Sequence, residues 1–301
     1  MQNRTVGPTL KNEQVRTALL LAAGTGSRLA PLTDQMPKCL VPVNEISILE
    51  RLVDSLQEHR FKKLVIVVGH QADAIRNFLG SRAGGMDITY ITSPAYKTTN
   101  NIYSLWLARK VINEPFLLLE SDIVFDSAML KGMLQPDRIA VAKLQPGMDG
   151  TTVTIDKLEK VGAFYDGAHK QRDNKHYKTV NFYSLSRQTW DMMRERLDQL
   201  IAAQQVNGYY ETVFADMVSE GCLSFAPVLF DHKRWHEIDN LVDLRAAERM
   251  CALRRQPAVR GAAKISNKLR CLTPPAYAHL KTLGSFRRVA TTTLPAALLH
   301  S

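Results

Sequence analysis

Apolar runs alternate with segments of helical periodicity through the N-terminal half of the chain. Four runs are apolar at nearly every position and are predicted to be strands: Thr17–Ala23, Lys63–Gly69, Asp87–Ile91 and Pro115–Asp122. The segments between them have helical spacing and are predicted to be helices: Ile48–His59, Ala72–Leu79 and Ile102–Ile112. Strands without polar alternation are typical of a parallel sheet covered on both faces, and right-handed crossovers then produce a doubly wound sheet.

The pattern changes after Arg138, where shorter strand-like runs are joined by polar loops. Strands are predicted over Ile139–Leu144, Thr151–Ile155, Thr179–Leu185 and Leu223–Phe230, and helices over Trp190–Gln204, Tyr209–Glu220 and Leu241–Leu253. We therefore expect an α/β domain with a Rossmann-like, doubly wound mixed sheet over residues 16–254. Residues 255–301 are expected to form a basic C-terminal extension without a regular fold.

Charge is distributed unevenly along the chain. The net charge is +10, but the segment Cys251–Ser301 carries nine Lys or Arg residues and no Asp or Glu, which leaves 30 basic and 29 acidic residues elsewhere. The body of the chain thus lacks the basic footprint of a nucleic-acid-binding protein. The four cysteines show no metal-ligand spacing, and neither an apolar leader nor a run of about 18 apolar residues is present. These features predict a cytoplasmic protein with no nucleic-acid partner and no transmembrane segment; the oligomeric state stays open, a homodimer included.

The first predicted strand ends in the loop AAGTGSRLAPLTDQMPK, residues 22–38. No Gly-Lys pair follows Gly24, which excludes a P-loop, and Leu29 stands where a dinucleotide fingerprint has its third glycine. The remaining interpretation is a loop whose backbone N–H groups approach a nucleoside triphosphate while Arg28 and Lys38 neutralise it. The plain alternative is a strand–turn–helix connection with a solvated arginine.

The segment LLLAAGTGSRLAPLTDQMPKCLVPV, residues 19–43, resembles the N-terminal signature of nucleotidyltransferases that activate sugar phosphates and alcohol phosphates. Within these, the chain is similar to the bacterial phosphocholine cytidylyltransferase-like and 2-aminoethylphosphonate cytidylyltransferase-like enzymes. The resemblance covers about residues 16–250 and rests also on Tyr96–Ala108, Phe116–Asp126, Lys178–Ser186 and Arg234–Glu248. The chain departs from the pattern at Asn44-Glu45-Ile46, where such proteins often have a glycine turn.

The resemblance implies the nucleotide-diphospho-sugar transferase type of fold and the transfer of CMP from CTP to a small acceptor, with release of pyrophosphate. The acceptor would be phosphocholine or a related amino-alkyl phosphate or phosphonate. Such a reaction brings two polyanions together, so it needs a divalent cation on carboxylates, expected to be Mg²⁺, and positive side chains on the triphosphate. Asp122 is a metal-ligand candidate because it ends a buried strand. Asp239 is one by the resemblance alone, since its position also suits a helix N-cap.

The other candidate residues follow from the loop and the resemblance. Arg28 and Lys38 are the catalytic candidates. Contacts with the nucleotide are expected from Ala22, Ala23, Gly24, Thr25, Gly26, Asn100 and Asn101, although helix capping competes for the asparagine pair. Contacts with the acceptor are expected from Lys178, Asn181 and Glu211, with Glu211 facing an amine.

Several weaker expectations accompany this set. Glu120 is expected to support the site from the strand that ends at Asp122. Tyr209, Tyr210 and Trp235 are candidates for cation–π contacts with choline, with at least one of them expected in the core instead. Two alternative functions stay open: an NTP-dependent sugar-1-phosphate nucleotidyltransferase, and a non-catalytic nucleotide-binding module.

Overall fold

The computed structural model describes residues 14–145, 148–167 and 176–252, and every structural statement below refers to them. They belong to the first of two compact units, Met1–Ala263; the second unit, Lys264–Ser301, lies outside them, as does the predicted basic extension. The predicted domain limit at residue 254 stays a prediction.

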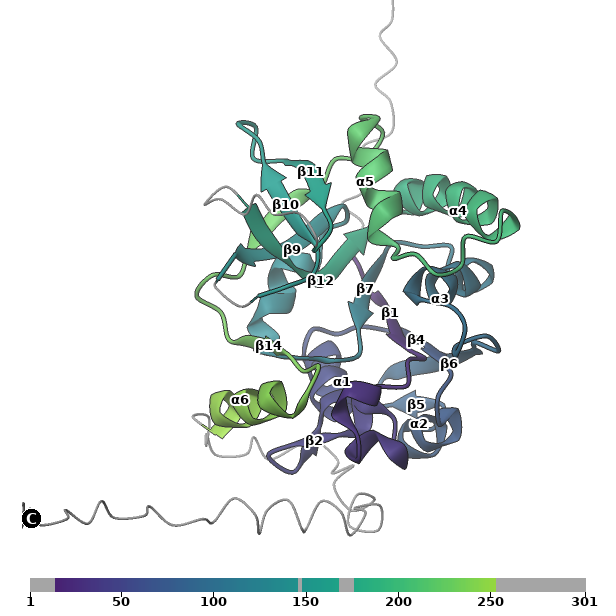
Figure 1. Ribbon diagram of the computed structural model, residues 1–301, viewed down its shortest axis with the longest axis vertical. Helices are drawn as coiled ribbons and strands as arrows, with labels where there is room; N and C mark the ends of the chain where they lie inside the picture. Colours follow the sequence, from purple (N-terminus) through teal and green to yellow (C-terminus); the bar gives the residue numbers. More distant parts are fainter. Residues whose placement is uncertain (1–13, 146–147, 168–175, 253–301) are drawn as a thin grey trace, which may run out of the picture. The chain divides into compact units, whose positions relative to one another are not determined.

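A mixed sheet of ten strands forms the centre of this unit (Figure 1). Its order is β11-β10-β12-β7-β1-β4-β6-β5, with β9 paired to β12 and to β13. The strands are β1 (Thr17–Ala22), β4 (Lys63–Val68), β5 (Arg82–Ala83), β6 (Met86–Thr92), β7 (Phe116–Glu120), β9 (Arg138–Lys143), β10 (Thr152–Ile155), β11 (Val161–Tyr165), β12 (His176–Leu185) and β13 (Ala226–Leu229). The expected doubly wound mixed sheet is confirmed.

Strand β1 occupies the position where the strand order reverses. It pairs in parallel with β4 on one side and with β7 on the other, from Thr17 onward in both ladders. Chain segments leaving β1 and β7 therefore separate at their carboxyl ends, and in open α/β sheets such a point forms the ligand crevice. The antiparallel pairing of β12 with β7 then joins the second half of the chain to the same sheet.

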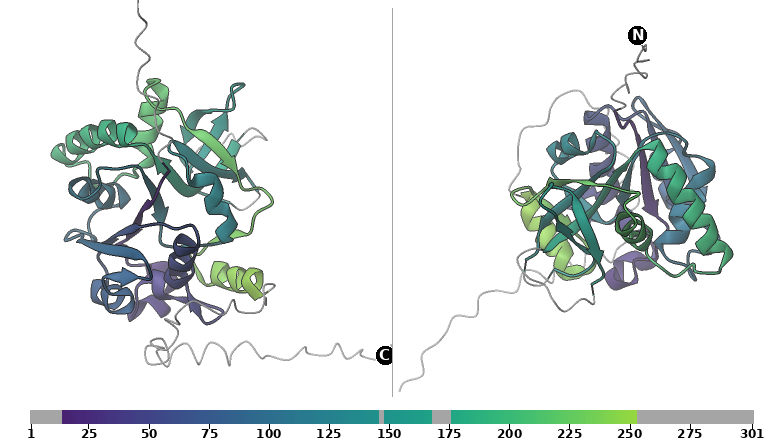
Figure 2. Two further views of the ribbon diagram at one scale, coloured as in Figure 1. Left: turned by 180° about the vertical axis from the view of Figure 1, so that it is seen from behind. Right: turned by 90° about the horizontal axis from the view of Figure 1, so that it is seen from above.

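Six α-helices accompany the sheet: α1 (Ile48–Glu58), α2 (Ala72–Leu79), α3 (Asn101–Leu107), α4 (Arg187–Ala202), α5 (Glu211–Ser219) and α6 (Leu241–Ala252). α3 and α4 lie side by side (Figures 1 and 2). Serine hydroxyls begin two of the helices: Ser47 accepts from Glu50 N at 3.1 Å, and Ser186 accepts from Thr189 N at 3.0 Å. Each bond satisfies an N–H that the first helical turn leaves without an intrahelical partner.

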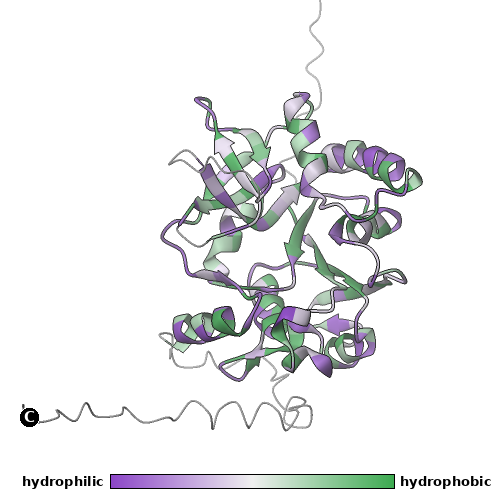
Figure 3. Cartoon of the chain, viewed as in Figure 1, coloured by the Kyte–Doolittle hydropathy of each residue, from purple (hydrophilic) through white to green (hydrophobic). Residues whose placement is uncertain are grey.

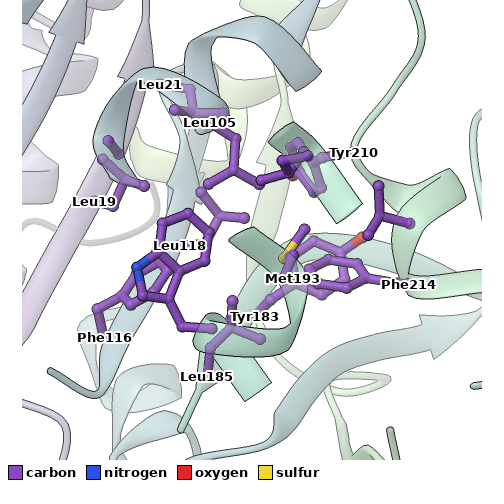
Figure 4. Packing of buried hydrophobic residues seen from close by; sticks show 14 of the residues in the cluster. Leu19, Leu21, Leu105, Phe116, Leu118, Tyr183, Leu185, Met193, Tyr210 and Phe214 are labelled. Atoms are coloured by element: carbon purple, nitrogen blue, oxygen red, sulfur yellow. The ribbon is translucent and has the colours of Figure 1, made fainter. Parts of the chain in front are cut away.

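One large hydrophobic cluster includes buried residues of the sheet and of helices α3, α4 and α5. Leu19 and Leu118 from the sheet meet Met193 and Phe214 from the helices (Figure 4). Apolar residues dominate β1, β4 and β7 along their whole length, whereas the helices alternate apolar and polar positions (Figure 3). This distribution is the one that the continuous apolar runs in the sequence predict.

Several short elements escaped the sequence pattern. The strand β11 and the paired strands β8 (Ile123–Phe125) and β14 (Trp235–Glu237) are only three to five residues long. Strands β2 (Pro42–Val43) and β3 (Ile46–Ser47) form a hairpin whose turn residues Asn44 and Glu45 both have positive φ, 51° and 73°. The turn thus forms without a glycine, since asparagine tolerates this conformation and the hairpin holds Glu45 in it. In the described part of the chain, no helix is long and apolar enough to cross a bilayer.

Candidate active site

A cleft of about 710 Å³ lies at the carboxyl ends of β1 and β7. Twelve of the fourteen predicted site residues line it: Ala23, Gly24, Gly26, Arg28, Lys38, Asn100, Asn101, Asp122, Lys178, Asn181, Glu211 and Asp239. Ala22 and Thr25 do not: Ala22 is buried in β1, and the exposed Thr25 lies outside the lining. The cleft brings together residues from both halves of the sheet.

The loop after β1 places Lys38 against Gly26. Gly26 has a φ of 65°, and a Cβ atom there would lie 3.0 Å from Lys38 Cβ and 3.1 Å from Thr33 Cγ2. The Thr33 hydroxyl donates to the Gly26 carbonyl oxygen at 2.8 Å and closes the loop. A side chain at position 26 would therefore meet both strain and a clash, so the glycine is needed to bring Lys38 into the cleft.

A short ladder carries the second acidic segment to the end of β7. β8 pairs antiparallel with β14, with Ile123 opposite Glu237, and the Ile238 N–H donates to the Asp122 carbonyl oxygen at 2.8 Å. Asp122, Glu237 and Asp239 each offer a carboxylate oxygen, and these three oxygens lie within 4.8 Å of one another. Asp122 and Asp239 are predicted from the sequence, whereas Glu237 is not, although it stands in the same His-Glu-Ile-Asp segment as Asp239.

Asp239 is not the N-cap of α6. The Asn240 side chain accepts from Val242 N at 2.8 Å and from Asp243 N at 3.1 Å, so Asn240 caps the helix. The Asp243 carboxylate in turn accepts from the backbone N–H of Asp239 at 3.0 Å. These bonds satisfy the start of the helix and leave the Asp239 carboxylate directed to the cleft.

The two basic residues of the loop bond to these acids. Lys38 Nζ donates to Asp122 Oδ2 at 2.9 Å and to Asp239 Oδ1 at 2.8 Å, and Arg28 donates to the same Asp239 oxygen at 2.8 Å. Burial lowers the pKa of Lys38, but the two carboxylates outweigh it and the net shift is upward. Lys38 therefore stays charged at neutral pH.

The carboxylate trio fits a hard divalent cation. Carboxylate oxygens are the donors that Mg²⁺ prefers, and it is commonly held by one or two carboxylates together with substrate phosphates. Asp122 Oδ1 is buried without a hydrogen-bond partner among the described residues, so it has a free coordination position. Burial, followed by the neighbouring acids Asp122 and Asp239, raises the pKa of Glu237, while Lys178 opposes the shift.

Beside Glu237, the cleft is lined by residues from an irregular stretch of β12. The pairing of β12 with β9 shifts between Thr179 and Tyr183, and Asn181 within this stretch has a φ of 58°. The Asn181 amide donates to Glu237 Oε1 at 3.3 Å, and the 4% exposed Lys178 lies with Nζ 3.5 Å from Glu237 Oε2. A Cβ atom on Gly150 would lie 3.0 Å from Lys178 Nζ, so this glycine leaves room for the ammonium group.

Two carboxyl groups that line the cleft, Glu120 and Glu211, have raised pKa values. Burial raises the pKa of Glu211 to about 7, and burial, followed by Asp122 and Glu211, raises the pKa of Glu120 well above its usual value. Tyr183 donates to Glu211 Oε1 at 3.4 Å, whereas Glu211 Oε2 is buried with no hydrogen-bond partner in the described chain. Glu211 thus offers an unsatisfied acceptor, and a negative charge when ionised, to a donor entering the cleft.

The asparagine pair has structural partners as well as a place on the cleft. Asn100 caps α3, since its side chain accepts from Asn101 N at 2.8 Å. The Asn101 amide donates to Glu120 Oε1 at 3.3 Å and its oxygen accepts from Tyr210 N at 3.1 Å. Asn101 therefore ties Glu120 to the start of α5, a long-range role that its sequence position did not reveal. Contact of either asparagine with a nucleotide stays a prediction.

The three candidates for cation–π contacts, Tyr209, Tyr210 and Trp235, differ in their exposure and in whether they line the cleft. Tyr210 is fully buried and packs against Tyr183 and Phe214, so it belongs to the core (Figure 4). Trp235 lies in β14 and does not line the cleft, whereas Tyr209 is 59% exposed and does. These three rings therefore do not form a cation-binding cage in the cleft.

Some residues that line the cleft were not predicted from the sequence. Besides Glu237, unpredicted lining residues come from the loops beside β10 and β11: Asp149, Gly150, Thr151, Asp166 and Gly167. The cluster of polar residues and glycines in these loops was the one signal available, and it is common to many surface loops.

Comparisons with known proteins agree with this geometry. Residues 17–152 match the family model described as Nucleotidyl transferase. A CMP-5'-(3-aminopropyl)phosphonate synthase of Streptomyces rubellomurinus is 33% identical over 241 residues, or 77% of this chain and 38% of that protein. A choline-phosphate cytidylyltransferase of Streptococcus pneumoniae is 30% identical over 120 residues, or 40% of this chain and 48% of that protein.

A solved structure shares the fold. The CTP:phosphocholine cytidylyltransferase from Streptococcus pneumoniae superimposes with a TM-score of 0.67 and 22% identity, over 78% of this chain and 99% of that one. The family match and the sequence relatives define the class: the chain belongs to the nucleotidyltransferase superfamily. The chain spans 38% of the length of the CMP-5'-(3-aminopropyl)phosphonate synthase and 48% of the length of the choline-phosphate cytidylyltransferase. The predicted family resemblance is confirmed.

Proposed function

We propose that the protein transfers CMP from CTP to a small amino-alkyl phosphate or phosphonate and releases pyrophosphate, in a reaction that depends on Mg²⁺. The observation that carries the proposal is the joining of two charged groups in one cleft. Arg28 and Lys38 bond to Asp122 and Asp239 of the carboxylate trio, whereas Lys178 lies 3.5 Å from the third member, Glu237, and opposes the rise in the pKa of Glu211. A triphosphate matches Arg28 and Lys38 in charge, and a zwitterionic acceptor matches Lys178 and Glu211.

The chain's own residues would bind and orient both substrates. The loop at Gly24 and Gly26 would give backbone N–H groups to the triphosphate, and Arg28 and Lys38 would neutralise it. Asp122, Glu237 and Asp239 would hold the divalent ion, which when bound stabilises negative charge on the phosphate oxygens. Lys178 would hold the acceptor's phosphorus oxygens so that one of them faces the α-phosphorus in line.

The amine of the acceptor would face Glu211. A primary ammonium group has N–H donors for the buried Glu211 Oε2 and a charge that offsets the carboxylate. A trimethylammonium group has no N–H donor and favours a cage of aromatic faces, whereas Tyr96 and Tyr209 are the only aromatic side chains among the described residues that line the cleft. We therefore favour an aminoalkyl acceptor over phosphocholine, which agrees with the aminopropylphosphonate named for one relative.

A pyrophosphate-release assay tests the function. The full chain would be incubated with Mg²⁺, each of CTP, UTP, ATP and GTP, and a panel of 2-aminoethylphosphonate, 3-aminopropylphosphonate, phosphocholine and glucose 1-phosphate. We expect release with CTP and the aminoalkylphosphonates. Release with glucose 1-phosphate alone would support the sugar-phosphate alternative, and no release with any pair would leave a non-catalytic binding module. A cytoplasmic location is part of the proposal and untested by this assay.

A further inference from the structure

The ammonium group of Lys38 occupies the place between two carboxylates of the metal trio. Its Nζ lies 2.9 Å from Asp122 Oδ2 and 2.8 Å from Asp239 Oδ1. A Mg²⁺ ion bound to those oxygens would lie about 2.0–2.1 Å from each, so the two cations would be near neighbours. Their repulsion in a partly buried site is strong, and the Lys38 side chain is only 14% exposed. Lys38 and a metal ion therefore exclude each other at these oxygens.

The charges of the trio are already balanced within the chain. Lys38 pairs with Asp122 and Asp239, and Arg28 pairs with Asp239 as well. Glu237 has Lys178 as its basic neighbour, at 3.5 Å. Three carboxylates thus face three basic side chains. A free divalent ion entering this cluster would create a surplus of positive charge, whereas a triphosphate without metal would draw Lys38 and Arg28 away and leave the carboxylates unpaired.

Resting on the proposed function, we propose that Lys38 and Arg28 are internal counter-ions of the metal carboxylates, which they release only when a triphosphate takes them up. The ligand of this end of the cleft is then a metal–nucleotide complex, and neither the free divalent cation nor the free triphosphate binds well alone. The affinity for each partner rises when the other is bound, by the same factor in both directions because binding free energies are linked. Arg28, with 69% of its side chain exposed, can move between the two partners without disturbing the core.

Metal binding in the absence of nucleotide tests this inference without any turnover. The dissociation constant for Mn²⁺ would be measured on the full chain by electron paramagnetic resonance of the free ion. We expect Lys38→Met to bind Mn²⁺ at least about tenfold more tightly than the wild type, within the usual range of coupling between sites. Lys63→Met removes a lysine whose Nζ pairs with Glu114 at 3.3 Å, outside the cleft lining, and should leave Mn²⁺ affinity unchanged.

Two further measurements keep the test decisive if Lys38→Met does not fold. Arg28→Gln changes an exposed side chain, and we expect it to tighten Mn²⁺ binding by about fivefold. Calorimetry of CTP binding to the wild type, without acceptor, should give at least about tenfold higher affinity with Mn²⁺ than with a chelator. If CTP binds but Mn²⁺ affinity is unchanged or weaker in the folded variants, the counter-ion role is overturned while the proposed function stands. If CTP does not bind under either condition, the proposed function fails first.

Discussion

Lys38 joins parts of the cleft that are far apart in the sequence. Its ammonium group bonds Asp122 and Asp239, which lie 84 and 201 residues further along the chain. Gly26 sets its position from within the same loop, through the close approach described above. The local backbone conformation thus positions Lys38. Residues far away in the sequence supply the carboxylates around its ammonium group.

Replacement of Lys38 by alanine should lower kcat by about 10²–10³-fold, because the triphosphate loses a charge positioned in a partly buried site. Steady-state kinetics of pyrophosphate release would measure the effect, and circular dichroism would confirm that the variant is folded. Lys63→Ala is the matched control and should keep the wild-type kcat. Near-normal turnover of folded Lys38→Ala would contradict its catalytic assignment.

The buried Glu211 should make the free energy of unfolding depend on pH. Its folded-state pKa is raised from 4.5 to about 7 by burial, so the stability it contributes is complete below the unfolded pKa and is lost as the pH rises through about 7. Between pH 5 and 8 the loss should be about 2–3 kcal/mol. Glu211→Gln cannot ionise and should not show this loss.

Urea unfolding of the wild type and Glu211→Gln at pH 5 and 8 would measure the difference. We expect the variant to gain stability relative to the wild type as the pH rises, and to show a higher KM for the aminoalkyl acceptor. Glu195→Gln, on the exposed side of α4, should change neither quantity. A wild-type curve that parallels that of Glu211→Gln across this range would contradict a raised pKa.

At the scale of secondary-structure elements, β14 and α6 act together. β14 pairs with β8 beside Asp122, and the N-cap of α6 at Asn240 follows directly after Asp239. The two elements hold Glu237 and Asp239 on either side of Ile238, whose N–H bonds the Asp122 carbonyl oxygen. A polar cap on one helix therefore also positions a metal-ligand candidate.

Asn240→Ala should cost about 1 kcal/mol of unfolding free energy, as expected for the loss of an N-cap, and should also weaken Mn²⁺ binding in the presence of CTP. Ser186→Ala removes the cap of α4, away from the cleft, and should cost a similar free energy without changing metal affinity. Thermal unfolding and metal titration of both variants would separate the two effects. Equal metal affinity in the two variants would show that the α6 cap does not position Asp239.

At the scale of the whole molecule, every described residue that lines the cleft precedes α6. The complete set lies between Leu21 and Asp239 and draws on both halves of the mixed sheet. The β1–β7 half supplies the loop with Arg28 and Lys38, and β12 supplies Lys178. The pairing of β12 with β7 therefore brings the two sets of lining residues into one cleft.

A chain ending at residue 254 should keep the pyrophosphate-releasing activity of the full chain within about threefold, since the cleft residues and the α6 cap are retained. The matched control is a chain ending at residue 234, which lacks β14, Glu237 and Asp239 and should be inactive. Loss of activity in the longer truncation, with its fold intact by circular dichroism, would mean that residues 255–301 take part in the reaction.

The predicted strands and helices agree best with the observed ones where neighbouring residues form a clear hydrophobic pattern. The continuous apolar runs at β1 and β4 and the helical spacing of α2 gave bounds within about a residue of those observed, because burial on both faces leaves a clear pattern. β8, β11 and β14 were missed, since a run of three to five residues is too short to show a periodicity. Their pairing partners, not their own side chains, make them strands.

The sequence by itself determined the parallel sheet, the loop with Gly26, Arg28 and Lys38, and the acid at the end of β7, because each depends on neighbouring residues. Only the tertiary structure decided the rest. It brought Glu237 to Asp122 and made Asn240 the cap in place of Asp239. It also turned Asn101 toward Glu120 and Tyr210, and buried Glu211. These outcomes depend on contacts between distant segments, and such contacts leave no periodic trace in the chain.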